Sequence, residues 1–387
     1  MKRIYLDNAA TSWPKPAPVA EAMLRYLTEN GAPAGRSGYA EANAAQRLVD
    51  DCRRRLAQLV GADHPRRIAM AFNGTDALNM ALHGLLRAGD HVVTTVWEHN
   101  SVLRPLAHLA RHGGVEVTYL EGNGFAVNDD EVAAAMRDET RLVAITHVSN
   151  VTGAIQPVHK IGRQVAEHPR ALLLVDAAQS LGHLPIDVVD LGADLLAAPG
   201  HKGLRGPLGT GLLYVGPRAE PQLQSWRQGG TGTQSEEPMQ PEALPERLEA
   251  GNLNMPGIAG LAAAVALLST EQLAAAAEHE RRLTERLLTG LAELPDVQVH
   301  GPADPSSALR TSVVSITSTL LPPQELAALL DASFRIQTRA GLHCAPLAHR
   351  KLNTLSQGGT LRFSPGPETK LEEIDYALQA LRELHGA

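Results

Sequence analysis

Short apolar runs alternate with stretches of helical periodicity from about residue 65 to residue 215, and this alternation constrains the fold more than any other feature of the chain. The helical stretches include TDALNMALHGLLRAG and SVLRPLAHLARHGG. The apolar runs are, in order, RRIAMAF, DHVVTTV, VEVTYL, RLVAITHVS, ALLLVDAAQ and ADLLAA. Such alternation predicts an α/β domain with a mostly parallel central sheet and helices on both faces.

The rest of the chain predicts a second, smaller region. Residues 216–256 are rich in Gly, Pro, Gln and Glu and predict loops, after which a long helical stretch begins at Gly257 with an expected break near Ser269. Strands are expected in VQVHG and TSVVSIT, and helices in PPQELAALLDAS and LEEIDYALQALRELHG. We therefore expect a large domain over residues 16–264, and a small α+β domain formed by residues 1–15 together with 265–387.

Composition excludes several classes of protein. The net charge of −7 and the scattered arginines provide no basic stripe for nucleic acid. Apolar runs too short to span a bilayer, and an N-terminus without a signal peptide, predict a cytoplasmic protein that does not bind membranes. Two cysteines, Cys52 and Cys344, cannot form a disulfide framework, and no paired-cysteine metal signature is present. No metal site is expected.

Polar residues follow the predicted strands where each strand ends. In parallel α/β sheets, ligands bind beyond the carboxyl ends of the strands, so these residues are the candidates for a site. They are Asn73, Gly74 and Thr75 after the first strand, Glu98 and His99 after the second, Asn150 after the fourth, Asp176 and Gln179 after the fifth, and His201 and Lys202 after the sixth.

Lys202 is the most informative of these residues, because the chain has only six lysines against 29 arginines. It lies in a loop, GHKGLRGPLG, whose glycines are expected to let the backbone approach a ligand closely. A lysine amine that loses part of its hydration there can form a Schiff base with an aldehyde. The alternative is an ordinary surface lysine in a flexible turn.

Three other segments supply what a phosphorylated pyridine aldehyde requires. Asp176 ends the apolar run LLLVD, where its carboxylate either pairs with a cationic ring nitrogen or caps the next helix. The segment NGTDALN begins a helix whose free N–H groups can bind a phosphate, and His99 can stack on an aromatic ring and transfer protons. Each has a purely structural alternative, but together with Lys202 they match the needs of pyridoxal 5'-phosphate.

Motifs along nearly the whole chain resemble one family. VDAAQSLGHLPID is followed by GHK, and Lys202 comes 26 residues after Asp176. Further matching stretches are YLDNAAT, EHNSVLRPL, THVSNVTGAIQP, EAGNLNMPGIAGL, TRAGLHCAPLAH and LRFSPG. The chain resembles the class V aminotransferase family of fold-type I pyridoxal-phosphate enzymes, and within it the cysteine desulfurases of the second group, which include selenocysteine lyases.

The resemblance implies a role for each residue that matches a family motif. It implies that Lys202 binds the cofactor covalently, that Asp176 pairs with the pyridine nitrogen, that Gln179 bonds the ring O3', and that His99 stacks on the ring and transfers protons. Gly74, Thr75 and His201 are expected to hold the phosphate, with Asn150 beside the ring and the substrate. Arg362 matches the arginine that binds the substrate carboxylate, and Arg339 matches a second arginine near it.

Cys344 carries the distinction between activities within the family. It follows His343 in RAGLHCAP, on a glycine-containing polar loop that favours a solvent-accessible, reactive thiol. The resemblance implies that Cys344 takes the sulfur of L-cysteine as a persulfide, and that its short loop makes fast turnover depend on a separate sulfur-acceptor protein. Cys52, inside a helical stretch, is expected to be an unreactive thiol. A metal role for His343, Cys344 and His349 lacks further ligands.

Four residues depart from the family pattern. Pro199 stands where a Ser or Thr hydroxyl is usual, Asn252 replaces a Thr that reaches the phosphate of the partner subunit, Tyr39 replaces a His, and Glu368 replaces an Asn.

Three functions therefore stay open: a cysteine desulfurase; a related lyase acting on selenocysteine, cysteine sulfinate or another cysteine derivative; and a noncatalytic scaffold in sulfur or metal-cluster assembly. The resemblance also implies a homodimer.

Overall fold

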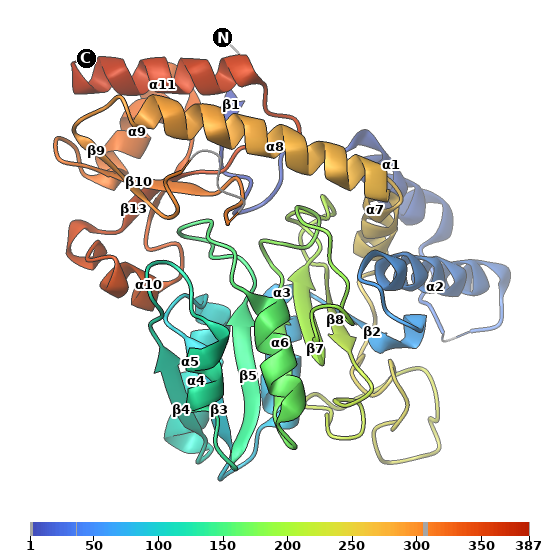
Figure 1. Cartoon of the computed structure of the whole chain (residues 1–387). Coiled ribbons are helices and arrows are strands. Elements are labelled where there is room, and N and C mark those ends of the chain that lie inside the picture. The colour runs from blue at the N-terminus through green and yellow to red at the C-terminus, as the bar shows by residue number, and fades with distance from the viewer. Residues whose placement is uncertain (1–2, 36, 305–308, 387) are drawn as a thin grey trace.

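A seven-stranded sheet forms the centre of the larger part of the molecule in the computed structural model, which describes residues 3–35, 37–304 and 309–386 (Figure 1). The strand order is β2-β8-β7-β6-β5-β3-β4, and all neighbours are parallel except β8, which is antiparallel to both β7 and β2. The predicted mostly parallel sheet is confirmed. The strands are β2 (Ile68–Ala71), β3 (His91–Thr95), β4 (Glu116–Leu120), β5 (Thr140–Thr146), β6 (Leu172–Asp176), β7 (Leu195–Pro199) and β8 (Gly211–Val215).

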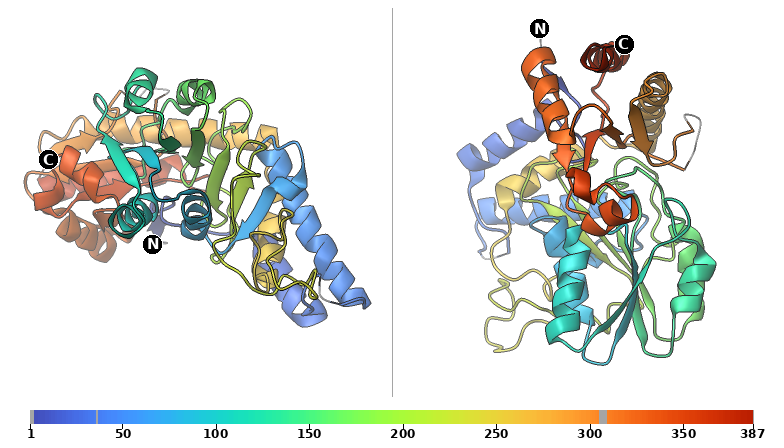
Figure 2. Two further views of the ribbon diagram at one scale, coloured as in Figure 1. Left: turned by 90° about the horizontal axis from the view of Figure 1, so that it is seen from below. Right: turned by 90° about the vertical axis from the view of Figure 1, so that its left-hand side faces the viewer.

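Helices cover both faces of this sheet, so its central strands are apolar on both sides (Figure 2). In β6, Leu173 and Val175 belong to the apolar cluster on one face, whereas Leu172 and Leu174 belong to the cluster on the other. The first face is covered by α2 (Ala40–Leu59), α5 (Asp129–Ala135), α6 (Val158–Glu167) and α7 (Met255–Val265), and the second by α3 (Gly74–Leu85) and α4 (Asn100–His112).

The C-terminal part has its own antiparallel sheet, of order β12-β13-β10-β9, and its own apolar core. Helices α8, α9 and α11 supply the apolar residues that cover it. Its elements are α8 (Thr270–Leu291), β9 (Val297–His300), β10 (Val314–Ser318), α9 (Pro323–Phe334), β12 (Arg339–Gly341), α10 (Pro346–Lys351), β13 (Thr360–Phe363) and α11 (Leu371–His385). Short 3-10 turns lie at Pro65–Arg67 and Leu355–Gln357.

The long helical stretch after residue 255 is broken as predicted. Helices α7 and α8 meet at 82°, because Ser269 begins a new helix with a capping box: its Oγ accepts the Gln272 N–H at 3.2 Å, and Gln272 Oε1 accepts the Ser269 N–H at 3.0 Å. Among the described residues no single helix is long and apolar enough to cross a membrane, although α7 and α8 taken together as a bent pair meet that criterion.

The start of the chain joins the two parts. Strand β1 (Ile4–Tyr5) pairs in parallel with β11 (Ile336–Gln337), and α1 (Ala17–Arg25), which continues into a π-helical turn at Tyr26–Asn30, packs against α7 (Figure 1). These two strands form a small sheet of their own, and the segment between β1 and α1 therefore crosses from the C-terminal part to the helices that cover the large sheet. The domain boundaries near residues 15 and 264 stay a prediction.

Candidate active site

A cavity of about 220 Å³ lies at the carboxyl edge of the large sheet, where the two parts of the molecule meet. The structure brings eleven of the twelve predicted site residues to its wall. They are Gly74, Thr75, His99, Asn150, Asp176, Gln179, His201, Lys202, Arg339, Cys344 and Arg362.

Asn252 is the predicted residue that does not line this cavity. It lies instead in the wall of a separate, smaller pocket with Phe72 and Arg227. A side chain that acts on the partner subunit has to lie outside the cavity of its own chain, so this position agrees with the role that the family resemblance implies for Asn252. That role stays a prediction.

The N-terminus of α3 provides an anion-binding seat. Asn73 caps the helix, with its Oδ1 accepting the Asp76 N–H at 2.8 Å, and the N–H groups of Gly74 and Thr75 have no acceptor inside the helix. A Cβ at Gly74 would lie 3.1 Å from the Pro199 ring, so glycine lets the helix start close to the end of β7. In the described part of the chain, the buried Nδ1 of His201 has no hydrogen-bond partner, which leaves one more donor for an anion.

A chain of hydroxyl groups links this seat to His99. Thr75 Oγ1 lies 2.7 Å from Ser101 Oγ, which lies 2.9 Å from His99 Nδ1. The Ser101 backbone N–H donates to the same Nδ1 at 3.0 Å, so the neutral ring carries its proton on Nε2. Sequence reasoning missed Ser101, although its place in the first turn of α4, two residues after His99, is the signal for such a contact.

Burial and the positive charges around His99 keep its ring neutral. Burial, and then the positive charge of Lys202, lower the pKa of His99 to about 4. At neutral pH the ring is therefore an uncharged surface that presents one Nε2–H donor.

Asp176 and Lys202 are the central charged pair of the cavity. Asp176 Oδ1 accepts the Ala178 N–H at 2.9 Å, while burial raises the pKa of Asp176 against the opposing effect of Lys202. Burial lowers the pKa of Lys202 to about 8, and the negative charge of Asp176 opposes this shift. About a tenth of the Lys202 amine is therefore unprotonated and nucleophilic at pH 7.

The backbone beside Lys202 is held by the N-terminal segment. The carbonyl oxygen of His201 accepts the Ser12 N–H at 3.1 Å, the Thr11 hydroxyl at 3.1 Å and the Lys15 ammonium at 2.7 Å. The Ser12 hydroxyl also donates to this oxygen, at 3.2 Å. Four donors on one carbonyl fix the residue that precedes the reactive lysine, and these contacts join residues almost 190 positions apart.

The glycines of this loop do not act as the sequence suggested. A Cβ at Gly200 would lie 2.2 Å from Thr210 Oγ1, and one at Gly203 would lie 2.3 Å from the Leu181 carbonyl oxygen. Neither glycine lines the cavity. The expectation that they let the backbone approach a ligand is corrected: they let the Lys202 loop pack against the protein itself.

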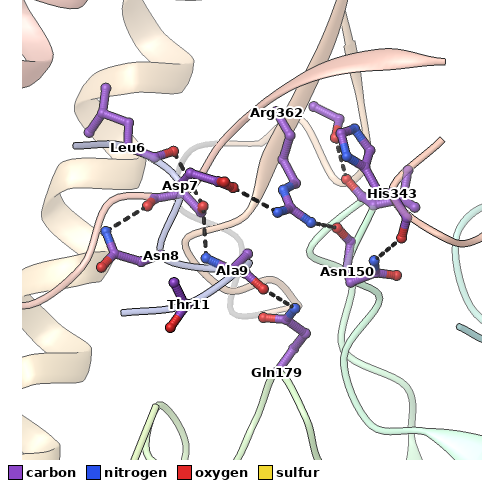
Figure 3. Close-up of polar contacts among 12 residues, drawn as sticks. Leu6, Asp7, Asn8, Ala9, Thr11, Asn150, Gln179, His343 and Arg362 are labelled. Carbon is purple, nitrogen blue, oxygen red and sulfur yellow. Dashed lines mark hydrogen bonds and ion pairs between the residues drawn. The ribbon is translucent and has the colours of Figure 1, made fainter. Parts of the chain in front are cut away.

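Arg362 is a buried guanidinium with one nitrogen, Nε, that lacks a partner among the described residues. Only 1% of its surface is exposed, and its Nη2 contacts Asp7 Oδ1 at 2.9 Å while its Nη1 donates to the Asn150 carbonyl at 3.0 Å (Figure 3). Its buried Nε has no partner in the described part of the chain. Arg339 lies directly opposite Arg362 in the β12-β13 pair and, among the described residues, forms no ion pair. Two neighbouring guanidinium groups favour a carboxylate as the ligand at this part of the cavity wall.

Cys344 lies on a short loop between β12 and α10, with its side chain exposed. Both His343 and Cys344 adopt the left-handed conformation, at φ values of 46° and 57°. The Cys344 carbonyl accepts the Asn100 N–H at 2.7 Å, and the His343 carbonyl accepts the Asn150 carboxamide N–H at 2.6 Å. The second cysteine, Cys52, is fully buried, and burial raises the pKa of its thiol to about 12. Cys344 is therefore the accessible thiol at the cavity.

The structure places three of the residues that depart from the family pattern: Pro199, Glu368 and Tyr39. Pro199 lines the cavity beside Gly74 and brings no hydroxyl to the anion seat. Glu368 pairs with Arg205 at 2.5 Å, which ties the end of the Lys202 loop to the C-terminal part. Tyr39, the third, is half exposed at the start of α2.

Glu98 is a buried carboxyl that does not line the cavity, although its position after a strand made it a candidate for the site. It is fully buried, and its Oε1 accepts the Thr95 hydroxyl at 2.6 Å and the Thr146 N–H at 3.1 Å. In the described residues its Oε2 has no partner. Burial raises the pKa of Glu98 to about 8, and the nearby charge of Asp176 adds to this effect, so the carboxyl is mostly protonated at neutral pH.

We expect Glu98→Gln to stabilise the protein more at pH 8 than at pH 5. The folded protein holds the Glu98 proton up to a pKa of about 8, whereas the unfolded chain loses it at about 4.5. The stability that this proton contributes is therefore complete below pH 4.5 and is lost as the pH rises towards 8. Gln has no proton to lose, so urea unfolding should show the variant gaining about 1–3 kcal/mol on wild type between the two pH values. Glu236→Gln, at an exposed site, is the control and should show no such gain. Parallel pH dependences for Glu98→Gln and wild type would contradict the expectation.

An open, mostly parallel sheet that presents a partly buried lysine, an aspartate and a neutral histidine beside an anion seat defines an enzyme of the α/β class, with an amine placed for carbonyl chemistry. A model of the aminotransferase class-V family matches residues 4–377, and the chain belongs to this family. The family is generally pyridoxal-phosphate-dependent, and the mixed, mostly parallel sheet is consistent with fold type I.

The relatives of the chain carry the same functional name. A probable cysteine desulfurase of Methanothermobacter thermautotrophicus is 36% identical over 388 residues, covering 99% of this chain and 95% of the relative. The cysteine desulfurase IscS of Methanosarcina thermophila is 32% identical over 99% of this chain and 92% of its own length. The apo structure of a cysteine desulfurase from Thermococcus onnurineus NA1 superimposes with a TM-score of 0.91 at 33% identity, covering 99% of this chain and 95% of that one.

Proposed function

We propose that the chain is a pyridoxal-phosphate-dependent cysteine desulfurase, which removes sulfur from L-cysteine to give L-alanine and a persulfide on Cys344. The observation that carries the proposal is the exposed thiol of Cys344 in the wall of the same cavity as Lys202 and Arg362. A sulfur-accepting nucleophile, a reactive amine and a carboxylate ligand are the three groups that this reaction needs.

The residues present fit the cofactor. Gly74, Thr75 and the orphaned Nδ1 of His201 would hold its phosphate, Asp176 its ring nitrogen and Gln179 its O3'. When bound, pyridoxal phosphate supplies an aldehyde that amines attack and a ring that delocalises the electron pair left at a substrate α carbon. The Gln179 Nε2 already donates to the Ala9 carbonyl at 2.9 Å, so its amide is oriented before any ligand binds.

Three residues of the cavity wall would bind the substrate, accept its α proton and donate a hydrogen bond: Arg362, Lys202 and His99. Arg362 can bind the substrate carboxylate through N–H groups that Asp7 and Asn150 leave free, because each of those residues takes only one of its N–H groups. Lys202, with its pKa lowered to about 8, can accept the α proton at Nζ. His99 is uncharged and accepts no proton readily, so its Nε2–H is a hydrogen-bond donor at the cavity wall, where it can hold a thiolate.

In the proposed reaction, Cys344 accepts the sulfur that leaves the substrate. Its thiolate attacks the substrate sulfur, the carbon–sulfur bond of the substrate breaks, and an S–S bond forms on Cys344. The thiol proton replaces sulfur on the substrate carbon, so that L-cysteine and Cys344 give L-alanine and the Cys344 persulfide. The short loop and exposed side chain of Cys344 support delivery of this sulfur to a separate acceptor protein.

The deciding experiment is intact-protein and peptide mass spectrometry after incubation of the holoenzyme with L-cysteine. We expect one added sulfur, located on the peptide that contains Cys344, and an equal amount of L-alanine. Added sulfur on the Cys52 peptide, or alanine without any added sulfur, would contradict the proposal. A protein that binds no cofactor and gains no sulfur would instead be the noncatalytic scaffold.

Arg339 favours one alternative substrate. Because it forms no ion pair among the described residues and lies opposite Arg362, it can bind a second acidic group that L-cysteine lacks. Cysteine sulfinate has such a group, whereas selenocysteine does not. A substrate panel of the three amino acids, run with wild type and Arg339→Ala, separates these activities: only a sulfinate preference should be lost in the variant.

We also propose a cytoplasmic homodimer. Its support is the position of Asn252 outside the cavity of its own chain, and the large apolar side chains that the single chain leaves exposed, among them Leu24, Leu27 and Phe72. Analytical ultracentrifugation tests the oligomeric state, and fractionation of cells tests the location.

A further inference from the structure

The loop that carries Cys344 is held at two successive carbonyl groups. The Asn150 carboxamide donates to the His343 carbonyl at 2.6 Å, and the Asn100 backbone N–H donates to the Cys344 carbonyl at 2.7 Å. Asn150 and His343 are both buried. These two bonds fix the peptide groups on either side of the Cys344 Cα, and therefore the direction in which its thiol projects.

The backbone at this point needs such anchors. His343 and Cys344 are consecutive residues with positive φ, a conformation that residues with a Cβ rarely adopt. On its other side, the His343 ring is fixed by Thr360, whose carbonyl and hydroxyl oxygens lie 3.1 and 3.0 Å from Nε2. Without the Asn150 bond, the loop would keep the ring contact but would lose the constraint on the peptide group that precedes Cys344.

The same asparagine also contacts the carboxylate-binding arginine. Its main-chain carbonyl accepts the Arg362 Nη1–H at 3.0 Å, while Asp7 holds Nη2 of that guanidinium at 2.9 Å (Figure 3). One residue at the end of β5 therefore touches both the group that would bind the substrate and the loop that carries the thiol. No other described residue is hydrogen-bonded to both Arg362 and His343.

We infer that Asn150 is a positioning residue for the Cys344 thiol: its carboxamide holds the His343 carbonyl, and its main-chain carbonyl holds the guanidinium of Arg362, so the distance between substrate and thiol is set through one residue. The inference deepens the proposed function and rests on it for the effect on turnover. The effect on the position of the thiol does not depend on any activity.

Two holoenzyme variants test it, Asn150→Asp and Asn150→Ala. Asp keeps the size of the side chain but cannot donate to a carbonyl when ionised, and Ala removes the side chain; both keep the main-chain carbonyl that binds Arg362. We expect the rate at which iodoacetamide alkylates Cys344, without substrate present, to change by about three- to tenfold, the factor expected from losing one hydrogen bond. We expect kcat to fall by about tenfold or more, as misplacement of a reacting group does, with KM changed by less than about threefold.

Asn30→Ala is the matched control, because the Asn30 carboxamide also donates to a single backbone carbonyl, that of Glu41 at 3.1 Å, in a part of the chain that does not line the cavity. Thermal unfolding establishes that each variant is folded. A folded Asn150→Ala protein whose Cys344 is alkylated at the wild-type rate would overturn the inference, whatever its activity. Failure of the proposed function looks different: wild-type protein would form no persulfide, while the alkylation rates would still decide the role of Asn150.

Discussion

Replacing Lys202 with alanine should abolish cofactor retention and lower the turnover of L-cysteine by about a thousandfold or more, within the range that a lost nucleophile and base produces. Lys202 is the amine in the wall of the cavity, and burial lowers its pKa to about 8. Alanine offers neither a nucleophile nor a proton acceptor at this point. The measurements are the visible absorbance of the purified protein after gel filtration and the release of L-alanine from L-cysteine.

The control for this prediction is Lys160→Ala, which removes an exposed lysine from α6 and should leave both quantities unchanged. Lys202→Arg is the second comparison, because it keeps a positive charge opposite Asp176 but cannot become a neutral amine. We expect it to be as inactive as the alanine variant. Retained absorbance and turnover in Lys202→Ala would assign the covalent role to another residue and would contradict our interpretation of the loop.

The large sheet and the residues at its edge could be predicted because both follow from short stretches of sequence. In runs such as LLLVD every position before the final Asp is apolar, which indicates a strand buried on both faces, and the residue that ends the run must lie at the carboxyl edge. The pattern therefore places Asp176 and Lys202 at the same edge of the sheet from the sequence alone. It needs only the direction of the strands.

The contacts that orient these residues could not be predicted in this way. The His201 carbonyl is held by Thr11 and Ser12, and Arg362 is paired with Asp7, across separations of 190 and 355 positions. Nothing in local periodicity indicates which distant segment will cross the sheet. The N-terminal motif YLDNAAT marks the segment as part of the family, but its physical task, bonding the loops that carry Lys202 and Arg362, requires the three-dimensional structure.

Burial was the second quantity that the sequence did not indicate. Glu98 and His99 are neighbours at the end of one strand, yet Glu98 is fully buried against Thr95 and Thr146, whereas His99 faces the cavity. The pKa of the first is raised to about 8 and that of the second is lowered to about 4, both mainly by burial. Each group is thus uncharged near neutral pH, and the sequence Glu98–His99 alone does not indicate this.

Replacing Cys344 with alanine should eliminate persulfide formation and lower sulfide release from L-cysteine in the presence of a reductant by about a hundredfold or more, as loss of a nucleophile does. The thiol is exposed, so its removal leaves no cavity, and we expect the free energy of unfolding to stay within about 0.5 kcal/mol of wild type. Cofactor retention should also be unchanged, because Lys202 and the anion seat of α3 are intact. Sulfide release at the wild-type rate would exclude the persulfide step.

The other cysteine makes this prediction specific, because the two thiols should affect opposite quantities. Cys52 is fully buried in α2, so Cys52→Ala removes a packed sulfur from the core and should cost about 1–2 kcal/mol of stability. It lines no part of the cavity, and persulfide formation should be retained. Urea unfolding and sulfur mass spectrometry should therefore separate the two variants. Cys344→Ala should be as stable as wild type but should form no persulfide, whereas Cys52→Ala should be less stable but should still form the persulfide. A different result would be a loss of both stability and sulfur transfer in both variants. The loss of sulfur transfer in Cys344→Ala would then reflect a damaged fold rather than a missing nucleophile. This result would contradict the assignment of the persulfide to Cys344.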